Sequence, residues 1–314
     1  MFYDPEYRMD IDQQMRRLLA ERFTGLPLGE RDPRRRAVQP TTNNALTPAA
    51  FGCDIFFPDD KYAQWHPMDS YDRLIHHRPG DLRSVFPFNE IIRQTRLMNE
   101  QLGIDEQPFF PPMGVLNNAV QLFGDRILGD LLDEPEIARM LLGILAEHEI
   151  EKLTINAAQG WRGNWYLFNC SVDMIGPAIY RDTVLEHDQA VARQARSLDC
   201  GVHLHHCGCF DRFAPVYQDL GPLKSMEIGF TSDPALAADF PMNSGPLYII
   251  LNHQILRTGT VRQVEDHVAA MLDKTAAISR RVVLLALDLD YGTPDANIRA
   301  LLEQCEIDRT GRRL

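Results

Sequence analysis

The chain has 314 residues, of which 45% are hydrophobic and 24% are charged, and its formal net charge is −12. This composition is typical of a globular protein with a large core, and the length suits a single α/β barrel. The acidic excess argues against a nucleic-acid partner, because phosphates are neutralised by basic side chains. No apolar run reaches the roughly 18 residues that cross a membrane. We therefore expect no membrane association.

The N-terminus has no signal-peptide pattern, so the sequence predicts a cytoplasmic protein. In that compartment, the six cysteines are expected to be free thiols or ligands rather than disulfides. Residues 1–50 are predicted to form an extension of one helix and a loop, packed on a barrel over residues 51–314. The helix is indicated over residues 9–23 by Ile11, Met15 and Leu18, which recur at helical spacing.

Residues 51–58, FGCDIFFP, alternate in the manner of a strand that ends at Pro58. Further strands are predicted within residues 160–169 and at 202–207, 223–229, 247–252 and 282–290. Helical spacing or capping residues predict helices at 86–102, 117–123, 135–145, 176–185, 188–198, 210–220, 234–240 and from 260 and 293 onward. Thr260 and Gln263 form a capping box, in which each side chain satisfies a backbone amide.

The second half of the chain therefore alternates strand and helix, with strands that are apolar almost throughout. This pattern is typical of parallel βα units covered on both faces. Neither GxGxxG nor GxxxxGK[ST] follows any strand, which argues against a nucleotide-binding fold. The predicted fold class is α/β, a single (β/α)8 TIM barrel.

Residues 202–210, VHLHHCGCF, hold the densest group of metal-binding side chains in the sequence. Successive side chains of a strand point to opposite faces, so His203, His205 and Cys207 share one face. An imidazole and a thiolate two residues apart provide half of a zinc-type site. The alternative is ordinary packing, because free cysteines and single histidines often lie in protein cores.

The active site of such a barrel lies at the carboxyl ends of its strands. His205 and Cys207 end one predicted strand, and Glu227 ends the next. Asp288 and Asp290 end the last predicted strand on one face. If the barrel forms, these side chains should converge.

The order of these segments carries a family resemblance. His205-His206-Cys207-Gly208 fits the His-x-Cys-Gly motif of the uroporphyrinogen decarboxylase-like superfamily, which includes zinc methyltransferases that work with corrinoid proteins. Other segments resemble the same superfamily in the same order, from about residue 165 to 305: SVDMIGPAIYRDTVLEHDQAV, MEIGFTSDPALAADFP, LNHQILRTGTVRQVEDHV and YGTPDANIRALLE. The resemblance implies a (β/α)8 barrel.

In the methyltransferase branch, the resemblance implies that His205 and Cys207 are zinc ligands. That branch supplies a third ligand, a Cys shortly before the final Gly-Thr-Pro, and this chain has none there. Asp288 is the nearest replacement, since a carboxylate can bind zinc. Glu227, His203 and Cys209 are weaker substitutes. Besides completing the site, Glu227 and Asp290 are candidates for moving protons.

The leading hypothesis is thus a methyltransferase that moves a methyl group between a corrinoid protein and a small-molecule donor or thiol acceptor, with Zn²⁺ as cofactor. A second hypothesis is a decarboxylase of a porphyrinogen-like substrate, with Asp54 at the pyrrole nitrogens. The Arg-x-Ala-Gly-Arg-Tyr signature of that branch is absent. A third hypothesis is a barrel that binds a corrinoid or another ligand without turnover.

Overall fold

The computed structural model describes residues 4–40, 45–58, 63–76, 80–243, 245–287 and 289–306. Within them, five parallel strands pair in chain order, so each strand lies beside the next one along the sequence. Helical segments connect each strand to the next, as parallel pairing requires. This confirms the predicted α/β class. The strands are β1 (Asn164–Phe168), β2 (Gly201–His206), β3 (Ser225–Ile228), β4 (Leu247–Ile250) and β5 (Val282–Leu285).

Helices precede the first strand over most of the N-terminal half. Helix α7 is the longest of the described helices, and its acidic first turn with a proline at the start agrees with the predicted beginning. The bounds are α1 (Pro5–Arg22), α2 (Leu46–Ala50), α3 (Asp72–His76), η2 (Leu82–Ser84), α4 (Phe88–Leu102), α5 (Val115–Phe123), α6 (Arg126–Asp133) and α7 (Pro135–Ala158).

The connections after the strands carry the remaining helices. The capping box of Thr260 and Gln263 is confirmed at the start of α13. The predicted helix at 210–220 is instead three short pieces, η5, α10 and η6. The bounds are η3 (Ser171–Met174), α8 (Pro177–Ile179), the π-helix η4 (Tyr180–Val184), α9 (Leu185–Ser197), η5 (Phe210–Arg212), α10 (Ala214–Tyr217), η6 (Gln218–Leu220), α11 (Pro234–Ala238), α12 (His253–Thr258), α13 (Val261–Thr275) and α14 (Asp295–Glu306).

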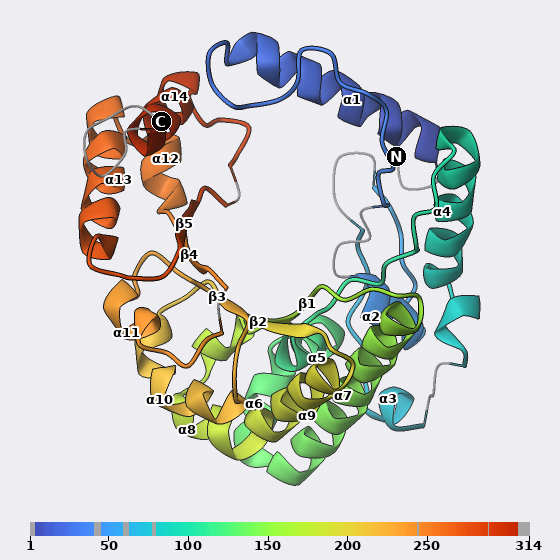
Figure 1. The fold of residues 1–314 in the computed structure, drawn as a ribbon. Coiled ribbons are helices and arrows are strands. Elements are labelled where there is room, and N and C mark those ends of the chain that lie inside the picture. The colour runs from blue at the N-terminus through green and yellow to red at the C-terminus, as the bar shows by residue number, and fades with distance from the viewer. Residues whose placement is uncertain are drawn as a thin grey trace.

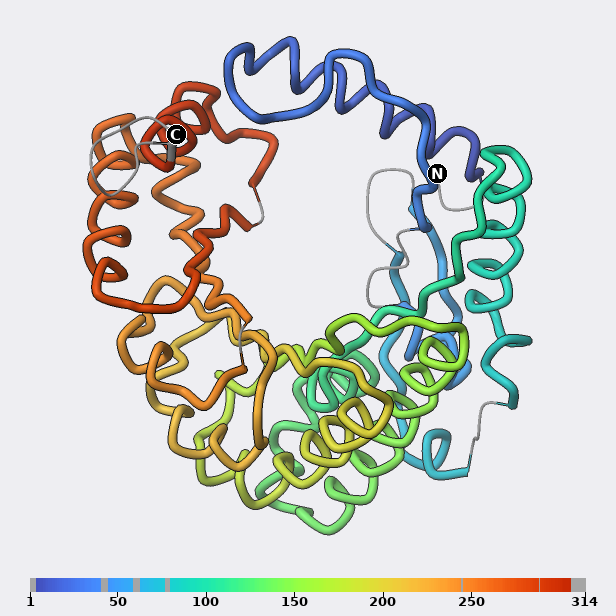
Figure 2. Tube along the Cα trace, in the orientation of Figure 1, coloured from blue at the N-terminus to red at the C-terminus, as the bar shows by residue number. Residues whose placement is uncertain are grey.

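The elements are arranged in a ring, and α1 bridges the space between α4 and α14 (Figures 1 and 2). Arg22, at the end of α1, forms an ion pair with Asp295 of α14, with 2.6 Å between Nη2 and Oδ1. The guanidinium of Arg299 lies over the ring of Phe23, 5.4 Å from its centroid. The first and last described helices therefore contact each other. The division of the chain at residue 50 remains a prediction.

One prediction for the N-terminal region is confirmed and another is wrong. The helix predicted at 9–23 forms as α1, in which Met15 and Leu18 are about half exposed while Met9 is fully buried. Residues 51–58 form no strand: only Phe56 pairs, in an isolated antiparallel bridge with Gln64. Alternation marks which side chains face the core, but a strand also needs a neighbouring strand to complete its hydrogen bonds.

The two faces of the sheet differ sharply. The outward face packs against the helices and contributes apolar side chains such as Trp165, Leu167, Leu204 and Met226 to the core. The inward face carries Tyr166, Phe168, His203, His205, Ser225, Glu227 and Tyr248, which pair across adjacent strands. Among the described helices, none has the length and apolar character needed to cross a membrane.

Candidate metal centre

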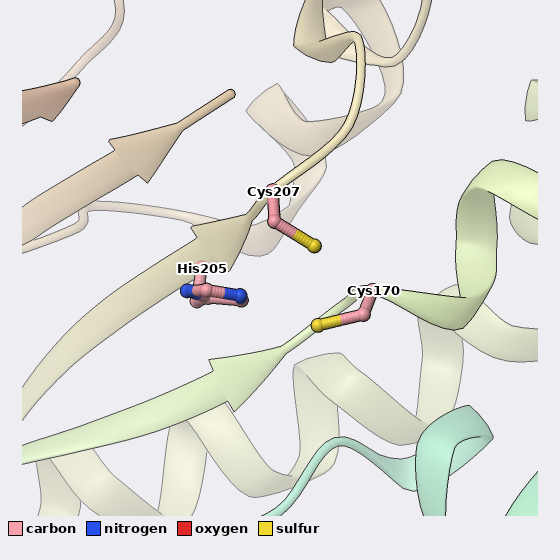
Figure 3. A group of neighbouring side chains, drawn as sticks. All are labelled: Cys170, His205 and Cys207. Carbon is pink, nitrogen blue, oxygen red and sulfur yellow. The ribbon is translucent and has the colours of Figure 1, made fainter. Parts of the chain in front are cut away.

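The register between β1 and β2 brings a third thiol to the predicted pair. Phe168 is paired with His205. Cys170 and Cys207 each lie two residues farther along, so both side chains leave the strand ends on the inward face. The ligand atoms of Cys170, His205 and Cys207 all lie within 4.8 Å of one another. Figure 3 shows the three side chains directed toward one another across the ends of the two strands.

The carboxylate of Glu227 holds the ring of His205. Oε1 of Glu227 lies 2.7 Å from Nδ1 of His205, and both side chains are about nine-tenths buried. Burial alone would lower the pKa of His205, but its contacts with Cys207 and Glu227 outweigh burial and raise this pKa to about 9. These contacts therefore favour the imidazolium in the metal-free protein.

The two thiols differ from each other in acidity. The neighbouring Cys207 lowers the pKa of Cys170, in opposition to burial. The same contact raises the pKa of Cys207, with burial acting in the same direction and His205 against it. Cys170 is thus the first of the two to ionise. Because a thiolate is the form that binds a metal, this cluster holds a proton that a metal would displace.

The segments that carry the thiols are fixed by polar contacts. Asp173 accepts a hydrogen bond from the backbone N–H of Cys209 at 3.3 Å and from Arg212 at 2.7 Å. A Cβ atom at Gly208 would lie 1.6 Å from Oδ2 of Asp173, so a side chain there would displace this carboxylate. Beyond the end of β1, the N–H of Ser171 donates a hydrogen bond to the side chain of Asn117 in α5 at 2.9 Å. Hydrogen bonds therefore fix both loops immediately beyond Cys170 and Cys207.

His203 lies one step deeper on the inward face. Its Nδ1 is 2.7 Å from Oγ of Ser225, and its Nε2 is 3.9 Å from Oε2 of Glu227. The ring of Tyr166 lies against it, with 4.1 Å between centroids. Burial lowers the pKa of His203 to about 4, so the ring is neutral at pH 7. His203 thus lies beside Glu227 without a hydrogen bond to it and is not among the three converging ligand atoms.

The other predicted site residues are Asp54, Asp288 and Asp290. Asp288, the predicted third ligand, lies outside the described residues. Asp290 is in an exposed turn, where Oδ2 is 2.7 Å from Nη1 of Arg257. Asp54 is exposed beside the buried Cys53. In the described parts of the chain, no hydrogen bond or ion pair links Asp54 or Asp290 to the cysteine and histidine group, so their catalytic roles remain predictions.

Cys170 is the ligand candidate that sequence reasoning missed. The sequence predicted a strand within residues 160–169, and Cys170 follows it directly. A signal was present, because Cys170 has the same parity as Tyr166 and Phe168. Using it required the register between this strand and the one that carries His205, which no local pattern in the sequence indicates.

The described strands form consecutive parallel βα units, and the thiol and imidazole cluster lies at their carboxyl ends. This arrangement is typical of the active sites of α/β barrel proteins. A sequence model of the uroporphyrinogen decarboxylase (URO-D) family matches residues 43–306, and the chain belongs to this family. The family fold is a (β/α)8 TIM barrel, which agrees with the predicted fold; five of its strands are formed in the described residues.

One solved structure similar to this chain is a methyltransferase from Methanosarcina mazei. The two chains have a TM-score of 0.57 and 16% sequence identity, and the match covers 96% of this chain and 87% of the other. No curated protein sequence matches the chain. The structural likeness supports the barrel fold.

Proposed function

We propose that this protein is a zinc-dependent methyltransferase that moves a methyl group between a corrinoid protein and a small-molecule donor or thiol acceptor. The observation that carries the proposal is the convergence of Cys170, His205 and Cys207 at the carboxyl ends of β1 and β2. Membership of the URO-D family and the methyltransferase neighbour support the reaction class. The corrinoid partner comes from the family resemblance.

The three side chains fit a zinc ion. Two thiolates and one imidazole are soft and borderline donors of the kind that zinc prefers. Three protein ligands also leave one coordination position open, as in catalytic zinc sites. When bound there, zinc would act as a Lewis acid that lowers the pKa of a thiol acceptor or polarises a methyl donor.

The surrounding residues have roles of their own. Because Glu227 contacts Nδ1 of His205, Nε2 is the ring nitrogen left for a metal, and the carboxylate fixes the ring orientation. Phe168 packs against His205 with 5.0 Å between ring centroids. Tyr248 lies beside His203 at 5.6 Å. These rings give the inward face an apolar floor that can exclude water from a methyl group in transfer.

The charge of the inward face argues against the decarboxylase hypothesis. A porphyrinogen with several carboxylates needs cationic partners. No Lys or Arg occupies an inward-facing position of the five described strands, whose imidazole and carboxylate side chains there are His203, His205 and Glu227. This wall suits a neutral or cationic substrate. The ligand-binding barrel without turnover remains the alternative that the activity assay tests.

Metal content is the first test. The purified protein should carry close to one zinc per chain by elemental analysis, without added metal or chelator. Cys170→Ser and Cys207→Ser should each lose most of it. Cys209→Ser is the matched control, because Cys209 is the same residue type in the same loop and lies outside the converging group. Full zinc occupancy in Cys170→Ser or Cys207→Ser would refute the proposed site.

Activity is the second test, with methylcobalamin in place of the corrinoid protein and a panel of small thiols as acceptors. Methyl transfer to at least one thiol, lost in Cys207→Ser and kept in Cys209→Ser, is the expected result. Zinc binding without transfer to any thiol or from any methyl donor would favour the ligand-binding barrel. Metal-free turnover of a porphyrinogen would favour the decarboxylase.

A further inference from the structure

The residues next to the candidate ligands point away from the site and are polar. Asn169 precedes Cys170, and His206 lies between His205 and Cys207. Alternation directs both into the core between sheet and helices, where Asn169 is 1% and His206 0% exposed. The other buried outward positions of β1 to β4 are apolar: Trp165, Leu167, Val202, Leu204, Met226, Ile228, Leu247 and Ile249. From these described strands, polar side chains therefore point into this core only at the strand ends that carry Cys170 and Cys207 on the opposite face.

Asn169 is held by two helical segments. Its Nδ2 donates to Oδ2 of Asp188 in α9 at 3.0 Å and lies 3.3 Å from Oη of Tyr180 in the π-helix η4. The hydroxyl of Tyr180 donates to the same Asp188 oxygen at 2.7 Å. All three side chains are buried. A π-helical turn is rare and costs regular hydrogen bonding, and here Tyr180, its first residue, reaches the end of β1.

His206 is held in the same way on the next strand. Its Nδ1 lies 2.8 Å from Oη of Tyr217, the last residue of α10. The rings of Tyr217 and Tyr180 meet edge to face with 5.3 Å between centroids. The contacts behind β1 and those behind β2 therefore form one cluster, which we call the anchor cluster: Asn169, Tyr180, Asp188, His206 and Tyr217.

We propose that the anchor cluster positions the sulfurs of Cys170 and Cys207 by fixing the strand ends that carry them. The cluster is costly to bury, since apolar residues of the same size would fill this core without desolvating a carboxylate. Its members are not among the three converging residues and would act through the backbone of their neighbours. The consequence for zinc rests on the proposed function, whereas the positioning of the two thiols does not.

Tyr217→Phe and Asn169→Leu test the inference, because each removes a polar contact and keeps similar volume. The control is Tyr71→Phe, which removes a tyrosine hydroxyl that hydrogen-bonds to Asp130 in the outer helices. Two affinities are measured on each folded protein, with circular dichroism as the check on folding. One is for Zn²⁺ by competition with a chromophoric chelator. The other is for phenylarsine oxide, which bridges two neighbouring thiols in the metal-free protein.

Both cluster variants should bind zinc and the arsenical about tenfold more weakly than the parent, the lower end of the usual effect of residues behind metal ligands. Tyr71→Phe should keep both affinities. Unchanged arsenical affinity in folded Tyr217→Phe and Asn169→Leu would overturn the inference, even if their thermal stability falls. If no protein binds zinc but the cluster variants still weaken arsenical binding, the zinc proposal fails and the positioning role stands.

Discussion

Replacing Asp188 with asparagine should change how the stability of this protein depends on pH. Asp188 is fully buried in the anchor cluster. Burial raises the pKa of its carboxyl from 3.8 to about 6, although the hydrogen bonds from Tyr180 and Asn169 act in the opposite direction. In the unfolded chain, the same carboxyl ionises near its ordinary pKa. The folded protein therefore keeps this proton over a pH range in which the unfolded chain has released it.

The sign and size of the pH effect on the free energy of unfolding follow from the difference between the pKa of Asp188 in the folded and the unfolded chain. Between about pH 4 and pH 6 the folded state binds more protons than the unfolded state, so the free energy of unfolding falls as the pH rises. The span from 3.8 to about 6, at about 1.36 kcal/mol per pH unit, corresponds to about 3 kcal/mol. This contribution is fully present below pH 4 and lost above pH 6. Asparagine cannot ionise, so the Asp188→Asn variant lacks this pH-dependent contribution.

The assay is urea unfolding of the parent and Asp188→Asn at pH 4, 5, 6 and 7. The free energy of unfolding of the variant, relative to the parent, should rise by about 2 to 2.5 kcal/mol across this range, since the unfolded carboxyl is already partly ionised at pH 4. Any constant cost of the new amide cancels, because only the change with pH is compared. Asp239→Asn, at an exposed carboxylate, is the control and should leave the profile of the parent unaltered. A flat difference for Asp188→Asn would refute the burial argument.

Three further predictions concern single contacts. Glu227→Gln should weaken zinc binding about 10-fold to 100-fold in chelator competition, and unchanged affinity would contradict its role in holding the imidazole. Gly208→Ala should displace Asp173, because the new Cβ would lie 1.6 Å from Oδ2, and should lower zinc affinity; Gly129→Ala, with no atom within 4 Å, should not. Asn297→Ala should cost about 2–4 kcal/mol in urea unfolding, since the buried Asn297 donates from Nδ2 to one buried and one partly buried backbone carbonyl. A loss below 0.5 kcal/mol, on the order of an ordinary surface change, would contradict this reasoning.

Local patterns were enough to predict much of the second half of the fold. The capping box at Thr260 depends on residues three positions apart, and the structure has it as predicted. The strands that carry His205 and Glu227 were predicted from local residue patterns and were found. Over residues 51–58 the same reasoning failed. Their alternation reflects burial of Phe51 and Cys53, but in the described structure no strand lies alongside to pair with them.

In the candidate site, too, some residues follow from local patterns and others depend on contacts between distant segments. Alternation within one strand placed His205 and Cys207 on a common face, because the direction of a side chain follows from its parity. The sequence by itself therefore determined two converging candidate ligands and the barrel wall that carries them. Cys170 and the anchor cluster were decided by the tertiary structure. Whether Cys170 meets Cys207 depends on the register of β1 against β2, and whether Asp188 meets Asn169 depends on how α9 packs on the sheet. Both are contacts between distant segments, which no local pattern encodes.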